Sequence, residues 1–296
     1  MSNTTTFVVD GNFYLHRAMS VVIKRRNPEQ LVKNSLTMFL NMMAGDAALL
    51  RATHVLVCFD SKRSFRNDLY KGYKANRVKG EGTTVTLDNG QEFHTDTTPG
   101  ALVKPAKVML DLGGIAHTQV KNREADDMMA SAATCLPGKV VIGTRDKDLA
   151  KCVNKRVSLY WPIEKKIITT KDVIAHFGVK PEQITDYLSL LGDKIDNIPG
   201  IPGCGPVTAR KILEKYGTLD VAVKDTDFRD KYKEHKGTLA MARKLVTLDT
   251  TIKYNLEDLL PQKVKKELGD HVWAIPTNLK DLADSRKMLA MKGLFG

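Results

Sequence analysis

The residues Thr6-Phe7-Val8-Val9-Asp10 form a short apolar run that leads directly into an aspartate, and Val55-Leu56-Val57-Cys58-Phe59-Asp60 repeats this arrangement. A third run, Val140 to Ile142, is followed closely by Asp146 and Asp148. Short runs rich in β-branched residues, without polar alternation, indicate strands that are buried on both faces. Open parallel sheets bind ligands beyond the carboxyl ends of their strands, so we expect these aspartates to meet at one edge.

Helical patterns separate these strands, at 31–50 and 125–136. Alternation of strand and helix predicts an α/β domain with a mostly parallel central sheet and helices on both faces. From about residue 170 the pattern changes to short helices. Thr170 is expected to cap a helix over 171–177, Gly178 to end it, and Pro181 to begin the next. A further helix is predicted from about 207 to 215.

Carboxylates also gather outside the strand ends. Glu124 and Asp127, like Asp193 and Asp196, are three residues apart and would share a face if their segments are helical. The candidate metal ligands are Asp10, Asp60, Glu124, Asp126, Asp127, Asp146, Asp148, Asp193 and Asp196. Converging carboxylates repel one another, and hard divalent ions such as Mg²⁺ relieve that repulsion. Two such ions about 4 Å apart favour an in-line phosphoryl displacement.

The overall charge indicates a polyanionic partner. The 296 residues include 46 Lys+Arg and 34 Asp+Glu, a net charge of +12, which favours nucleic acid, although a soluble protein that is merely basic explains charge alone equally well. The four cysteines are far apart, which indicates reduced packing residues in a cytosolic protein. The sequence shows no leader-like or membrane-length apolar run, so we expect neither a secreted nor a membrane-spanning protein.

Two further segments point to DNA. Residues 62–79 carry seven basic side chains against one acid, with Tyr70 and Tyr73 available for base stacking. The second segment, 199–206, holds Gly200, Gly203 and Gly205 before a basic helix with Arg210 and Lys211. Glycine allows close approach of backbone to phosphate, and such a hairpin would grip duplex without sequence preference.

At these residues the sequence resembles the 5′-nuclease family, which comprises flap endonucleases, phage 5′→3′ exonucleases and the 5′-nuclease domain of bacterial DNA polymerase I. The resemblance runs from Phe7 to about Leu213. It rests on Val-Val-Asp10-Gly, Cys-Phe-Asp60, an arch motif with Arg66 and Tyr73-Lys74-Ala-Asn-Arg77, the metal motifs at 124–127 and 144–148, and a helix–three-turn–helix (H3TH) element at 192–206.

The resemblance implies a role for each matching residue. Asp10, Asp60, Glu124, Asp126, Asp127 and Asp146 would form the first metal site, and Asp148, Asp193 and Asp196 the second, with Asp146 or Asp126 bridging. Lys74 and Arg77 would contact the scissile phosphate, Arg66 and Tyr73 would bind DNA, with Tyr73 stacking on a nucleotide, and the hairpin would hold duplex phosphates around a K⁺ ion. The implied reaction is Mg²⁺-dependent hydrolysis, with Mn²⁺ able to substitute, that leaves a 5′-phosphate and a 3′-hydroxyl during DNA replication and repair.

The expected organisation follows from these assignments. Residues 1–169 form the α/β nuclease core with a basic arch at about 62–100, residues 170–261 form the helical H3TH region, and residues 262–296 pack back on the core. The segment 83–95 departs from the family because it predicts a β-hairpin around Asn89-Gly90 where relatives often continue in a long helix. The arch would then be shorter or differently roofed, which leaves open whether a free 5′ strand threads through it.

We predict a 5′→3′ exonuclease and flap endonuclease that acts on branched, nicked or 5′-ended duplex DNA, or on RNA–DNA hybrid. The expected setting is a monomer in the cytoplasm of a bacterial or phage-infected cell. Two alternatives stay open at this point, a PIN-like ribonuclease and a catalytically inert, structure-specific DNA-binding module. The glycine hairpin with its two carboxylates argues against the ribonuclease, and the intact carboxylates with Lys74 argue against the inert module.

Overall fold

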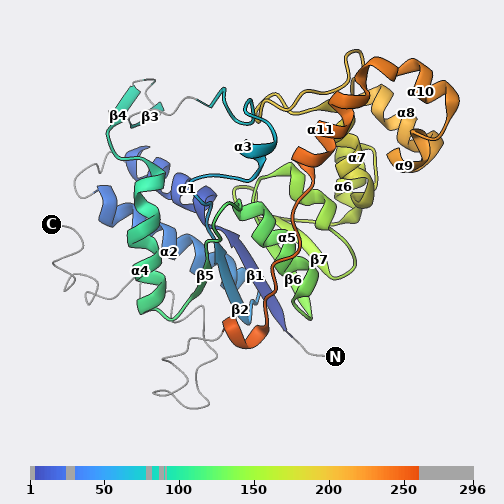
Figure 1. Ribbon diagram of the computed structural model, residues 1–296. Coiled ribbons are helices and arrows are strands. Elements are labelled where there is room, and N and C mark those ends of the chain that lie inside the picture. The colour runs from blue at the N-terminus through green and yellow to red at the C-terminus, as the bar shows by residue number, and fades with distance from the viewer. Residues whose placement is uncertain (1–3, 25–30, 78–81, 87–89, 91, 260–296) are drawn as a thin grey trace.

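A six-stranded sheet forms the centre of the molecule (Figure 1). The computed structural model describes residues 4–24, 31–77, 82–86, 90 and 92–259. Its strand order is β5-β2-β1-β6-β7-β8, in which all neighbours are parallel except the last pair. The strands are β1 (Thr5–Asp10), β2 (His54–Cys58), β5 (Ala116–Thr118), β6 (Lys139–Gly143), β7 (Val157–Trp161) and β8 (Lys166–Ile168). The predicted mostly parallel sheet is confirmed.

Helices bury both faces of this sheet. In β1, Phe7 and Val9 pack into one apolar cluster, whereas Val8 belongs to another on the opposite face. The first cluster is covered by α1 (Gly11–Lys24), α2 (Leu31–Leu49) and α4 (Val103–Leu112), and the second by α5 (Ala125–Cys135). Because both clusters are apolar, the strands lack polar alternation, and the polar groups of the core lie at the strand ends.

The helical region follows the sheet and joins the α5 side of the core (Figure 1). Its elements are α6 (Thr170–Phe177), η3 (Pro181–Gln183), α7 (Ile184–Leu191), α8 (Pro206–Tyr216), α9 (Leu219–Ala222), α10 (Thr226–Lys231), η4 (Lys233–His235), α11 (Lys236–Val246) and η5 (Leu256–Leu259). The cap of α6 is Thr169 rather than Thr170, because Thr169 and Asp172 form a capping box. Gly178 ends this helix with a φ of +72°, as predicted.

Three further short helical segments connect the strands. These are α3 (Arg66–Leu69), η1 (Pro99–Leu102) and η2 (Lys147–Cys152). The predicted hairpin is confirmed, since β3 (Thr83–Thr86) pairs antiparallel with β4 (Glu92–Thr95). The prediction for 262–296 lies outside the described residues. Among the helices that the structure describes, none is long and apolar enough to span a bilayer.

Candidate active site

The aspartates that end the strands lie side by side, because β2, β1 and β6 are neighbours in the sheet. Asp10 Oδ1 accepts a hydrogen bond from the Phe13 amide at 2.9 Å, and its Oδ2 accepts one from the Thr144 hydroxyl at 3.1 Å. Asp60 Oδ1 accepts from the amide of Ala125, the first residue of α5, at 2.7 Å. These bonds aim carboxylates from separate strands at a common place beyond the sheet edge.

Crowding of these carboxylates raises their pKa values. Burial, with the charges of Asp60 and Asp146, raises the pKa of Asp10 to about 7. Burial and the charges of Asp146, Asp10 and Asp60 also raise the pKa of Asp126 well above its usual range. The shifts share one cause, a concentration of negative charge in a poorly solvated place, which a bound cation would relieve.

Asp148, in the predicted second metal site, also lies among negative charges. Burial and the neighbouring Asp146 raise the pKa of Asp148 to about 8, and Asp148 Oδ1 is buried without a hydrogen-bond partner. Asp193 lies in a turn closed by a β-bridge to Ile198, so the 193–196 segment is not helical, and Asp193 and Asp196 do not share a helix face. Lys147 Nζ pairs with Asp193 Oδ2 at 2.7 Å and neutralises the charge of this carboxylate.

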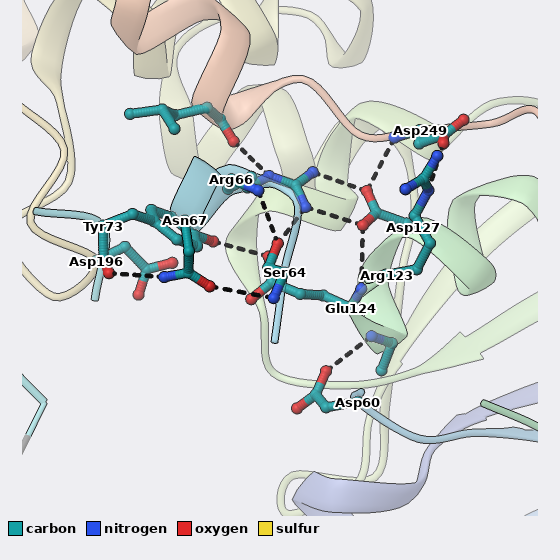
Figure 2. Close-up of polar contacts among 12 residues, drawn as sticks. Asp60, Ser64, Arg66, Asn67, Tyr73, Arg123, Glu124, Asp127, Asp196 and Asp249 are labelled. Carbon is teal, nitrogen blue, oxygen red and sulfur yellow. Dashed lines mark hydrogen bonds and ion pairs between the residues drawn. The ribbon is translucent and has the colours of Figure 1, made fainter. Parts of the chain in front are cut away.

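Glu124 is the N-cap of α5, and its carboxylate accepts hydrogen bonds from side chains of the 64–74 segment (Figure 2). Its carboxylate accepts from the Ser64 hydroxyl at 3.2 Å, the Tyr73 hydroxyl at 2.8 Å and Arg66 Nη1 at 2.9 Å. Lys74 Nζ completes the set. Burial alone would raise the pKa of Glu124, but the charges of Lys74 and Arg66 hold it below its usual range. Glu124 is therefore ionised and already paired.

Asp127 does not join the carboxylate cluster. It is fully buried, and it accepts both outer nitrogens of Arg66 at 2.7 and 2.8 Å, the Asp249 amide at 2.9 Å and the Glu124 amide at 3.1 Å (Figure 2). These four bonds occupy the lone pairs of the carboxylate. The prediction of Asp127 as a metal ligand conflicts with this geometry, and the residue anchors Arg66.

Two predicted DNA contacts are also corrected. Arg66 is only 1% exposed, and besides Glu124 and Asp127 it donates to the carbonyl oxygens of Leu245 and Thr247 at 2.7 and 2.8 Å. Tyr73 is 5% exposed, with its hydroxyl on Glu124. Arg66 is thus enclosed by its acid and carbonyl partners, and Tyr73 packs in the apolar cluster on the α5 side, so neither side chain is exposed for a DNA contact or for base stacking.

Lys74 and Arg77 do lie beside the acids. Lys74 bonds to Glu124 and lies 3.6 Å from Asp196 Oδ2, and Arg77 bonds to Asp196 Oδ1. The Lys74 amide also donates to the Asp196 carbonyl at 2.9 Å, with Lys74 at a φ of +54°. A non-glycine residue with this φ is strained, and functional sites often hold such residues. The arch and the 193–198 turn are joined here across the site.

The predicted hairpin residues have unequal surroundings. Gly200 packs so closely on the Leu191 carbonyl that a side chain would not fit, so this glycine serves the turn itself. Gly203, with a φ of +73°, and Gly205, the N-cap of α8, are exposed with open space beside them. Arg210 and Lys211 are exposed on α8. Of the predicted hairpin residues, Gly203, Gly205, Arg210 and Lys211 are therefore the ones that are exposed.

Sequence reasoning missed several supporting groups. Thr144 links the two metal motifs, since its hydroxyl donates to Asp10 and accepts from the Asp146 amide at 3.1 Å. Asn12 Oδ1 holds the Asp60 amide at 2.9 Å. Both stand within two residues of a strand-end aspartate, a signal that could have found them. Lys147 lies between the predicted ligands Asp146 and Asp148, so the same proximity in sequence could have identified it.

As the side chains stand, no three Asp, Glu, His or Cys residues in the described ranges are grouped closely enough to hold a metal ion. Three of the predicted ligands are instead in ion pairs, Glu124 with Lys74, Asp196 with Arg77 and Asp193 with Lys147.

Comparison with known proteins agrees with this geometry. Residues 5–178 match the family model of the 5′-3′ exonuclease N-terminal resolvase-like domain, and 179–267 match that of the 5′-3′ exonuclease C-terminal SAM fold. The chain belongs to the 5′-3′ exonuclease family. Its membership confirms the predicted resemblance and the predicted enzyme class, a 5′ nuclease.

Relatives of two kinds are found. The chain is 31% identical over 270 residues to the 5′-3′ exonuclease of Aquifex aeolicus (strain VF5), covering 88% of this chain and 87% of that one. It is 33% identical over 288 residues to the DNA polymerase I of Rhizobium leguminosarum, covering 89% of this chain but 27% of the polymerase. The fold also matches the T5 D15 protein co-crystallised with metal ions, with a TM-score of 0.66 at 17% identity over 94% of this chain and 98% of that one.

Proposed function

We propose that this 5′-3′ exonuclease cleaves branched, nicked or 5′-ended duplex DNA, with Mg²⁺ as its natural cofactor and Mn²⁺ as a substitute. The observation that carries the proposal is the meeting of Asp10, Asp60 and Asp146 at the ends of three neighbouring strands, beside Asp126. The protein would act as a monomer in the cytoplasm of a bacterial or phage-infected cell, and would accept RNA–DNA hybrid as well as DNA.

The residues present fit divalent ions. The unpartnered Asp148 Oδ1 and the mutual repulsion of the strand-end acids are what an oxygen-ligated cation would satisfy. We assign Asp10, Asp60, Asp126 and Asp146 to the first site, with Glu124 joining them where Lys74 leaves it for the substrate, and Asp148, Asp193 and Asp196 to the second. Asp127 is left out because Arg66 and two backbone amides hold it. When bound, the ions supply charge neutralisation at the scissile phosphate and a more acidic water.

The chain's own cations would receive the substrate. Lys74 and Arg77 are already held over Glu124 and Asp196 and would exchange these acids for the scissile phosphate. Gly203, Gly205, Arg210 and Lys211 would contact duplex phosphates, with K⁺ on the hairpin carbonyl groups. Support for this assignment comes from the exposure of all four residues, with Gly205 at the N-cap of α8 and both cations on that helix.

A cleavage assay tests the proposal. A 5′-labelled flap duplex and a single-stranded RNA are incubated with the protein in Mg²⁺ and in EDTA. We expect metal-dependent cutting near the flap junction that leaves a 5′-phosphate. Cutting of RNA alone would replace the proposal with the PIN-like ribonuclease, and tight binding without cleavage would replace it with the inert module.

Substitution of Lys74 by alanine separates chemistry from binding. Because Lys74 is held among the acids, we expect single-turnover cleavage to slow by about 10²-fold, with the Kd for the flap duplex changing less than about threefold. Lys155→Ala is the matched control, since Lys155 is exposed, lies outside the basic 62–79 segment and the hairpin, and should leave both values nearly unchanged. Equal losses of rate and affinity in Lys74→Ala would make Lys74 a phosphate anchor only.

A further inference from the structure

A second concave site is lined by residues of α3 and α11 and of the segment from α9 to α10. Its volume is about 1130 Å³. Its apolar floor includes Phe228 and Leu239, which are buried, and Leu69 and Val223, which are 40% and 41% exposed. We call this the α11 groove. Apolar side chains that remain exposed along a concave surface indicate an interaction site.

The rim of the α11 groove is basic. Arg229, Lys233, Lys236 and Lys244 line it and are exposed. Within the described ranges these four side chains have no ion-pair partner, whereas Arg123 and Arg243, also on the rim, are paired with Asp249 and Asp220. With Asp230 as the remaining rim acid, the groove presents a net positive charge around an apolar floor.

We propose that the α11 groove binds an acidic amphipathic peptide segment of a protein partner. An apolar floor needs protruding apolar side chains, which a peptide helix offers in an i, i+3, i+4 pattern. The DNA surface presents phosphates and sugar edges, and its protein interfaces are more polar than this floor. The volume also exceeds the roughly 300–1,000 Å³ of small-molecule sites. The unpaired rim cations select for acids flanking the apolar side chains.

The groove shares its wall with the support of the active site. Phe65 lines the groove, and the guanidinium groups of Arg66 and Arg123 lie over its ring, at 4.6 and 4.8 Å from the ring centroid. Asp249, also on the wall, donates its amide to Asp127. A segment bound here would therefore touch residues that hold the N-terminus of α5, while leaving the carboxylate cluster open to DNA.

Fluorescence anisotropy on the full chain tests the proposal. The probe is a labelled peptide of about 14 residues, with leucines at i, i+3, i+4 and i+7 and glutamates elsewhere, beside a scrambled peptide of the same composition. We expect the ordered peptide to bind at least about tenfold more tightly than the scrambled one. Val223→Asp should weaken its binding by about tenfold, and Val221→Asp by less than about twofold. Val221 is 51% exposed on α9 and does not line the groove.

Charge reversal gives the second arm. The Lys236→Glu, Lys244→Glu double variant should weaken the ordered peptide by about tenfold at low salt. The double variant Lys165→Glu, Lys171→Glu changes the same charge on exposed residues outside the groove and should not weaken it. The proposal is overturned if the two peptides bind alike, or if both valine variants behave alike. It is also overturned if the Lys236→Glu, Lys244→Glu variant instead weakens binding of a nicked duplex by about tenfold, because the groove would then be a DNA-binding surface.

Discussion

Replacing Asp146 with asparagine should abolish flap cleavage and, in EDTA, make the protein more stable. Asparagine keeps the side-chain oxygen that accepts the Asp148 amide at 2.8 Å, so the local turn survives. It removes a charge that raises the pKa values of Asp10, Asp126 and Asp148. We expect a loss of cleavage on the order of 10³-fold or more, because the assigned ligand set loses a charge.

The sign of the stability change follows from the same pKa shifts. The pKa of Asp10 is about 7 in the folded protein, above its ordinary value of 3.8, so the unfolded chain releases this proton first. The stability that protonated Asp10 contributes is complete below about pH 4 and is lost as the pH rises to about 7. Asp146→Asn should lessen this loss and raise the melting temperature in EDTA at pH 8 by about 2–4 °C, from roughly 1 kcal/mol.

Thermal melts with and without Mg²⁺, beside cleavage assays, check both effects. Mg²⁺ should raise the melting temperature of the unsubstituted protein more than that of Asp146→Asn, since binding to the folded state stabilises it. Asp227→Asn is the control, because Asp227 is an exposed acid on α10. Near-normal cleavage by Asp146→Asn would contradict the ligand assignment, and an unchanged melting temperature would contradict the proposed repulsion.

The fold was predictable because its signals are local. The runs that became β1, β2 and β6 are short, β-branched and continuous in apolar character, and each is followed by an aspartate in the chain. The order of the strands in the sheet then brings Asp10, Asp60 and Asp146 together, so one rule about strand ends identifies the centre of the site.

The direction in which a side chain points was not predictable at the same level. Asp126 and Asp127 are adjacent acids with equal claims in the sequence, yet α5 turns the first toward Asp10 and Asp146 and the second toward Arg66. Arg66 lies in a run of cations typical of a DNA contact. Its partners Leu245 and Thr247 are 179 and 181 residues away, and no local pattern relates them.

The hairpin residues show the same limit. Three glycines in one segment suggest one shared role, but Gly200 is required by a close backbone contact with Leu191, whereas Gly203 and Gly205 face open space. The difference between Gly200 and the other two glycines depends on how the chain folds back on α7, and the spacing of the glycines in the sequence does not predict that fold. Residue type thus predicted the chemistry of the site, and tertiary contacts decided which residues take part in it.

Replacing Arg66 with alanine should cost about 3–5 kcal/mol in the free energy of unfolding. The change leaves Asp127, which has no exposed surface, as a buried acid without its cation, and frees two carbonyl oxygens at the end of α11. Breaking a buried pair by removing one partner is far more costly than the pair is stabilising. Arg66→Lys keeps the charge but not the two-pronged geometry, so we expect an intermediate loss.

Urea unfolding, followed by circular dichroism, measures this cost. Arg63→Ala is the matched control, because Arg63 lies three residues earlier, is exposed, and pairs with exposed Asp68, an arrangement that contributes less than about 1 kcal/mol. A loss below about 1 kcal/mol for Arg66→Ala would contradict the structural role. Under conditions where the variant stays folded, its affinity for a flap duplex should match that of Arg63→Ala or exceed it. A selective loss of affinity would restore Arg66 as a DNA contact, whereas retained affinity with slower cleavage would show that it acts by holding Glu124.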